Sequence, residues 1–108
     1  HFRKMIFKNV DAEALANIYF DGKVTSHSLI TQEGEKITVG IIYPGVYHFN
    51  TESSERMEIT SGACNVKLDG DAEESIYESG QYFEVPASSG FEITVQDQIC
   101  QYVCRFLN

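Results

Sequence analysis

The stretch HFNTESSERMEITSG, residues 48–62, contains the change of pattern on which the fold of this chain depends. Met57 and Ile59 alternate with more polar residues, as in a strand that buries one face. Beyond Ser61-Gly62 the alternation resumes one residue out of phase, at Cys64, Val66 and Leu68. A slip of phase at a glycine indicates a bulge or tight turn, with which a chain turns a corner between strands.

Short apolar segments separated by turn signals such as Pro44-Gly45 and Asp69-Gly70-Asp71 make up most of the chain. The predicted strands are 22–30, 37–43, 45–50, 56–68, 75–77, 82–85, 91–96 and 99–107. Many short strands with frequent turns are typical of a β-sandwich or barrel, so we expect an all-β protein. Residues 11–20 are the exception, because an Asp11 N-cap followed by Leu15 and Tyr19 near one face predicts a short helix.

The last predicted strand, 99–107, is apolar on both faces. Tyr102, Cys104 and Phe106 alternate with Val103 and Arg105. A strand of this kind is expected at the centre of a sheet, covered on both sides. The Arg105 guanidinium then needs a carboxylate or an anion as its partner.

The composition limits the classes of function. The chain has 108 residues, enough for one domain with a small core, and a net charge of -8, which argues against nucleic acid as a partner. It contains no apolar run long enough to span a membrane. Three cysteines without metal-type spacing, Cys64, Cys100 and Cys104, are expected to be reduced and packed, which favours a cytoplasmic location.

Residues 48–62 resemble the metal-binding signature of cupin barrels, in which His-x-His is followed by a glutamate and later a glycine. Glu55 and Gly62 fit that signature, but Asn50 stands where the second histidine is expected. The second cupin signature fits at Gly80 and Pro86, with Phe91 in place of its histidine. Only His48 and Glu55 remain, and a transition-metal site normally needs three protein ligands, so we expect none.

The chain as a whole resembles the small cupin-type pyrimidine/purine nucleoside phosphorylases of bacteria. The motifs that carry the resemblance are YFDGKV (19–24), VGIIYPGVYHFNT (39–51), ERMEITSG (55–62), YESGQYFEVP (77–86) and YVCRF (102–106). The resemblance implies a single-domain cupin barrel over 19–108, preceded by an extension over 1–18. It also implies a homodimer that converts purine and pyrimidine nucleosides to free base and α-D-ribose 1-phosphate, with inorganic phosphate as co-substrate and no cofactor.

Few cations are present to bind that phosphate. Arg105 and Lys23 lie within matched motifs and are the candidates; for Arg105 an ion pair with a buried glutamate is the alternative. Lys36 by a turn, and Lys67 on an outward position, are expected to be solvated, and Arg56 matches no family position.

Glu55 takes an inward cupin position, from which it either binds ribose hydroxyls or pairs with Arg105. Met57 is expected to line the same cavity or to be core. The candidates for stacking on the base, each with a core role as its alternative, are Tyr47, Phe49, Phe83 and Phe91.

His48 is expected at the surface or at the edge of a pocket. Two rival functions remain open, a non-enzymatic cupin that binds a small ligand and a metal-dependent cupin enzyme.

Overall fold

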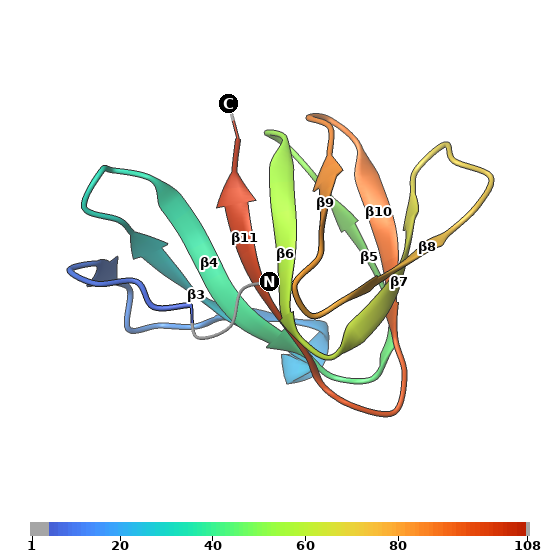
Figure 1. Cartoon of the computed structure of the whole chain (residues 1–108), viewed down its shortest axis with the longest axis horizontal. Helices are drawn as coiled ribbons and strands as arrows, with labels where there is room; N and C mark the ends of the chain where they lie inside the picture. The colour runs from blue at the N-terminus through green and yellow to red at the C-terminus, as the bar shows by residue number, and fades with distance from the viewer. Residues whose placement is uncertain (1–4, 108) are drawn as a thin grey trace.

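Two antiparallel sheets enclose one core in the computed structural model, which describes residues 5–107 (Figure 1). The seven-stranded sheet has the order β1-β3-β4-β11-β6-β9, with β2 also paired to β3. Its strands are β1 (Asp11–Ala12), β2 (Asn17–Tyr19), β3 (Val24–Ile30), β4 (Lys36–Ile42), β6 (Glu55–Ser61), β9 (Tyr82–Val85) and β11 (Cys100–Phe106). The four-stranded sheet, β5-β10-β7-β8, contains β5 (Gly45–Asn50), β7 (Ala63–Leu68), β8 (Ser75–Glu78) and β10 (Gly90–Val95).

The all-β class is confirmed, and the described residues form a single domain. The two sheets are not hydrogen-bonded into one closed cylinder, so the predicted barrel is not confirmed. Strands β4, β5, β6 and β7 alternate between the two sheets, and so do strands β8, β9, β10 and β11. Within residues 5–107 there is no helix of the length and apolar character that crossing a bilayer takes.

The corner predicted at Ser61-Gly62 is confirmed, because the chain passes there from β6 in one sheet to β7 in the other. Gly62 has a φ of 81°, which favours glycine, and a Cβ atom there would lie 2.6 Å from the Ile99 carbonyl oxygen. The pairing of β6 with β11 shifts register between Gln101 and Tyr102, where Thr60 is an extra residue on β6, as in a bulge beside the corner.

The helix predicted over 11–20 is wrong. Residues 11–12 and 17–19 are short strands along one edge of β3, and a 3₁₀ turn, η1 (Phe20–Gly22), follows them. Leu15, which the helix would bury, is 86% exposed. Pairing supplies partners to the backbone groups on that edge of β3, and this outweighs the weak helical pattern.

Strand β11 is central, as predicted, between β4 and β6. Its inner face contributes Cys100, Tyr102 and Cys104 to the core shared by the two sheets. Its outer face carries Val103, which is 2% exposed, and Arg105. All three cysteines are buried free thiols, as expected.

Candidate functional site

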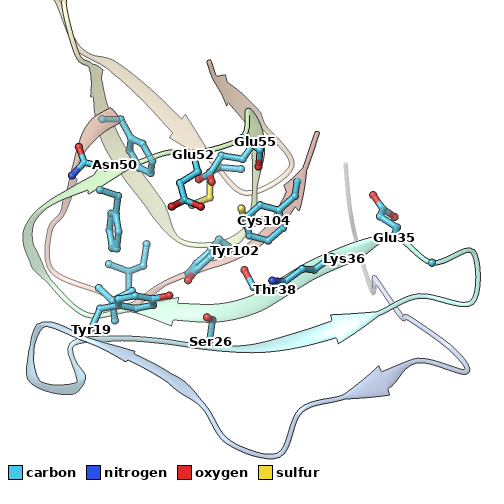
Figure 2. Close-up of a pocket in the computed structure, with 18 of the residues that line it drawn as sticks. Tyr19, Ser26, Glu35, Lys36, Thr38, Asn50, Glu52, Glu55, Tyr102 and Cys104 are labelled. Atoms are coloured by element: carbon cyan, nitrogen blue, oxygen red, sulfur yellow. The ribbon is translucent and has the colours of Figure 1, made fainter. Parts of the chain in front are cut away.

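A cavity of about 770 Å³ opens over the inner face of the seven-stranded sheet (Figure 2). Strands β3, β4, β11 and β6 supply its floor, and β5 and β10 supply part of its wall. The polar residues that line it are Ser26, Glu33, Glu35, Lys36, Thr38, Asn50, Glu52, Ser53, Glu55, Tyr102 and Cys104. The apolar and aromatic residues are Tyr19, Val24, Ile42, Phe49, Met57, Phe91 and Phe106.

The register of the sheet places a cation and a carboxylate on the same cross-strand row. On one side, Phe106 of β11 pairs with Glu55 of β6. On the other side, Arg105 pairs with Ile37 of β4, so the next residue, Phe106, lies beside Lys36. Lys36 Nζ lies 5.5 Å from the centroid of the Phe106 ring. With strands about 4.8 Å apart, the backbones of Lys36 and Glu55 are about 10 Å apart across the cavity floor. In Figure 2, Glu52 and Glu55 lie across the cavity from Lys36 and Thr38.

Burial raises the pKa of Glu55 above its ordinary value of 4.5, and a hydrogen bond with Cys104 offsets part of that rise. The pKa of the Cys104 thiol is also raised, by burial first and then by the charge of Glu55. The thiol therefore stays protonated and can donate to the carboxylate. Glu55 is held in place by its neighbour on β11 without being neutralised by a cation.

The middle of the floor carries a row of hydroxyl groups. Ser26 on β3 and Tyr102 on β11 both pair with Gly40, so no side chain separates these two residues on the cavity floor. A Cβ atom at residue 40 would overlap the Thr25 carbonyl oxygen and lie 2.8 Å from Ser26 Cβ. Burial raises the pKa of Tyr102, so its hydroxyl is neutral at any physiological pH.

Aromatic rings gather at the far end of the cavity. Phe49 stacks on Phe91 with ring centroids 5.7 Å apart, and Tyr19 and Phe20 meet Phe49 edge to face at 5.9 and 5.4 Å. Tyr19 pairs with Val24, which pairs with Ile42. This end of β4 lies six residues from Lys36, or about 20 Å along the strand.

Four of the residues predicted for the site are brought together here. Glu55, Phe49, Met57 and Phe91 all line the cavity. Tyr47 and Phe83 are buried in the core and do not line it, and the Tyr47 hydroxyl donates to the Tyr43 carbonyl oxygen at 2.8 Å. Lys23 follows η1 and also lies outside the cavity lining.

Arg105 lies on the opposite face of the sheet from the cavity. Its Nε donates to Glu58 at 2.9 Å and its Nη1 to Glu35 at 3.1 Å, so its partners are these two carboxylates and not Glu55. Glu58 is 5% exposed, whereas the Arg105 side chain is 23% exposed. This ion pair joins the outer face of the sheet to Glu35, next to Lys36 at the mouth of the cavity.

His48 is a surface residue, one of the two placements expected for it. It faces away from the core, and its Nε2 lies 2.9 Å from an Asp69 carboxylate oxygen. The inward positions of β5 are taken by Tyr47 and Phe49. Within residues 5–107 there is no group of three or more His, Cys, Asp or Glu side chains placed to hold a metal ion.

The charged lining residues that prediction from the sequence missed are Glu33, Glu35, Lys36 and Glu52. Lys36 is exposed, as expected for a lysine beside a turn, but it is also the first residue of β4, on the same face as Thr38, and it lines the cavity. The alternation Lys36, Thr38, Gly40 and Ile42 could have identified that face. For Glu52, in the loop between β5 and β6, no sequence pattern gave a signal.

Comparison with known proteins gives one consistent result. A family model described as pyrimidine/purine nucleoside phosphorylase matches residues 14–106. A pyrimidine/purine nucleoside phosphorylase of Herminiimonas arsenicoxydans is 48% identical over 101 residues, which are 94% of this chain and 96% of that protein. The protein of that name in Thiobacillus denitrificans is 49% identical over 100 residues, 93% of this chain and 96% of that one. A crystal structure of a protein of unknown function from Acinetobacter sp. ADP1 matches with a TM-score of 0.91 at 38% identity, over 94% of this chain and 98% of that one.

The Arg105–Glu58 pair generates a prediction for stability. Arg105→Met leaves a buried carboxylate without its main partner, which should lower the free energy of unfolding by about 3 kcal/mol, the lower end of the range for such pairs. We expect the lower end because Arg56 Nη1 remains 4.0 Å from Glu58. Urea denaturation measures the change. Adding Glu58→Gln should restore much of the loss, whereas adding Glu55→Gln should not; recovery with Glu55→Gln instead would contradict the pairing.

Proposed function

Because this chain belongs to the pyrimidine/purine nucleoside phosphorylase family, as its motifs indicated, we propose that it cleaves nucleosides by phosphorolysis in the cavity described above. An oxygen of hydrogen phosphate forms a bond to C1′ of the ribose while the bond from C1′ to the base nitrogen breaks. The electron pair of that bond leaves with the base, which takes up the proton of the phosphate. The products are the free base and α-D-ribose 1-phosphate.

The observation that carries this proposal is the division of the cavity into an aromatic end and a polar end. Phe49 and Tyr19 offer ring faces and edges to a base, and the buried Phe91 supports Phe49 from behind. Glu55 and Glu52 offer carboxylate oxygens to ribose hydroxyls. Stacking on rings depends little on which base is present, because every base has a π-face, and this supports a broad range of purine and pyrimidine substrates.

The reaction needs no covalent nucleophile. Its transition state has the character of a ribosyl oxocarbenium ion, which a bound phosphate and nearby carboxylates stabilise by charge. The Glu55 carboxyl group lines the cavity and, among the described residues, has no cationic partner, so its ionised form is suited to this role. We propose that the reaction is independent of metal and of any other cofactor, because Asn50 and Phe91 stand where the cupin signatures have histidine ligands.

The first test of this function is base release from uridine and from adenosine, each with and without inorganic phosphate. We expect release only when phosphate is present, at a rate that EDTA leaves unchanged. The readout is chromatography of the free base together with ribose 1-phosphate. Binding of nucleoside with no turnover would favour the rival function of a non-enzymatic ligand-binding protein. Loss of activity in EDTA, with recovery on adding a divalent metal, would contradict the metal-independent chemistry.

Glu55 provides a second prediction, with a defined pH dependence. Glu55→Gln removes the charge and should lower kcat/KM at pH 7.5 about ten- to hundredfold, since a hydrogen bond to a charged group contributes about 1.5–3 kcal/mol. Because the pKa of Glu55 is raised, wild-type kcat/KM should begin to fall, as pH is lowered, at a pH above the ordinary 4.5. The ratio of wild-type to variant kcat/KM should shrink through that range, since the variant has no carboxylate to protonate. A constant ratio from pH 8 to pH 5 would contradict a role for the ionised side chain.

We propose further that the protein is a homodimer in the cytoplasm. Val39 and Tyr82 are 37% and 49% exposed on the outer face of the seven-stranded sheet, where Arg56 lies 4.4 Å above the Tyr82 ring. Exposed tyrosine and arginine of this kind are enriched at protein interfaces. The three free thiols are compatible with a reducing compartment.

The proposed dimer is tested by measuring the mass of the protein in solution. Sedimentation velocity at micromolar concentration should give twice the 12.2 kDa of the chain. Tyr82→Glu should shift the protein towards monomer by burying a charge in the interface, whereas Ile76→Glu, on the exposed edge strand β8, should not. A monomer in the unaltered protein would refute the dimer.

A further inference from the structure

The phosphate that phosphorolysis consumes needs a binding site, and neither cation predicted for it lies in the cavity. Arg105 is on the opposite face of the sheet, held by Glu58 and Glu35, and Lys23 is outside the cavity lining. Among the cavity-lining residues that the structure describes, Lys36 is the one cation, and four glutamates accompany it. An anion that enters this cavity therefore has one favourable position.

We propose that inorganic phosphate binds between the Lys36 ammonium group and the hydroxyl groups of Tyr102 and Thr38, at the polar end of the cavity. The inference rests on the proposed function and identifies the subsite for the second substrate. Thr38 lies between the other two in register, two residues from Lys36 along β4 and opposite Cys104, the inner-face neighbour of Tyr102 on β11. Figure 2 shows Lys36, Thr38 and Tyr102 on one side of the cavity and Glu52 and Glu55 on the other.

The hydrogen bonds beneath Tyr102 leave its hydroxyl hydrogen free to point into the cavity. Asn17 Nδ2 can only donate, and it donates to Ser26 Oγ at 3.2 Å and to Ser28 Oγ at 3.0 Å. Ser26 Oγ therefore accepts from Asn17, which leaves its own hydrogen available to a neighbour. Tyr102 pairs with the same Gly40 as Ser26 and lines the cavity, where its hydroxyl can donate to a ligand. A neutral phenol that donates is suited to an anion, and the raised pKa of Tyr102 keeps it protonated.

The lengths agree with a nucleoside and a phosphate bound end to end. The aromatic end at Ile42 and the polar end at Lys36 are six residues apart on β4, about 20 Å. A base between the rings directs its ribose towards the row that holds Lys36 and Glu55, which lie on either side of Phe106. An α-phosphate product from a β-nucleoside requires attack from the side of C1′ opposite to the base, and Lys36, at the end of β4 remote from the rings, is on that side.

The residues around Lys36 also explain its position. Its stem lies along the Phe106 ring, with Nζ 5.5 Å from the ring centroid. The preceding residue, Glu35, is bonded to Arg105, so the start of β4 is fixed from the outer face of the sheet. A cation among glutamates offsets part of the local negative charge, which would otherwise exclude an anion.

The subsite is tested by measuring the KM for phosphate and the KM for uridine separately in each variant. Lys36→Met should raise the KM for phosphate ten- to hundredfold and change the KM for uridine less than threefold. Lys36→Arg should recover part of the loss, because it restores the charge. Tyr102→Phe should raise the KM for phosphate by a smaller factor. The matched control is Lys67→Met, on the outward face of β7, which should leave both values unchanged. Melting temperatures verify that each variant is folded, and an unchanged phosphate KM in folded Lys36→Met would overturn the proposal.

Direct binding separates failure of this subsite from failure of the proposed function. Titration of the protein with inorganic phosphate, followed by ³¹P line broadening without nucleoside, should show saturable binding that Lys36→Met weakens at least tenfold and Lys67→Met does not. This result would support the anion subsite even if no nucleoside tested were cleaved. Absence of phosphate binding in the unaltered protein, or equal binding in Lys36→Met, would refute the subsite whatever the activity.

Discussion

Strand β11 is buried on both of its faces, and the arrangement of the other strands around it depends on this double burial. It lies between β4 and β6 and so connects segments that are far apart in sequence. Its inner residues Tyr102, Cys104 and Phe106 form the middle of the cavity floor. On the outer face, the partly buried Arg105 guanidinium would destabilise the fold if it were not paired with Glu58 and Glu35. One strand thus serves both the stability of the sheet and the chemistry of the cavity.

The cavity has little positive charge for a protein that is proposed to bind phosphate. Its single lysine is surrounded by carboxylates in a chain of net charge -8. Neutral hydroxyl donors can supply the remaining contacts to an anion without adding charge. Such a site holds a small free anion by local hydrogen bonds and does not attract polyanions by a long-range field. This is consistent with a substrate that is a nucleoside and not a nucleic acid.

Much of the fold was predictable from the sequence because alternation and turn residues are strong local signals. The predicted strands and the corner at Gly62 followed from these signals, and so did the central position of β11. The helix over 11–20 failed because the pairing of β1 and β2 with β3 is a tertiary effect that local spacing does not report. The closed barrel was inferred from resemblance. Whether two sheets are joined by hydrogen bonds at their edges depends on tertiary contacts, which the alternation of residues along the sequence does not specify.

The candidate site was predictable in part, for the same reason. Residues on inner strand positions, such as Glu55, Phe49 and Phe91, were found by their alternation or by motif position. Lys36 was missed because a lysine next to a turn is usually solvated, and only the pairing of β4 with β11 shows that it faces Phe106. The partners of Arg105 were missed because Glu35 lies 70 residues away along the chain.

The alternation of strands between the two sheets also affects how the protein is made. Each sheet contains a local unit, β1 to β4 in one and β7-β8 in the other, but its remaining pairings join strands far apart in sequence, so neither sheet can form from local hairpins alone. β11 follows all the other strands and supplies the floor on which Lys36, Glu55 and Tyr102 are brought together. During synthesis on the ribosome, β4 and β6 therefore remain without their shared neighbour until this segment has left the exit tunnel. The cavity is completed only at that point, so a nascent chain that has not yet released β11 lacks the floor of the proposed site.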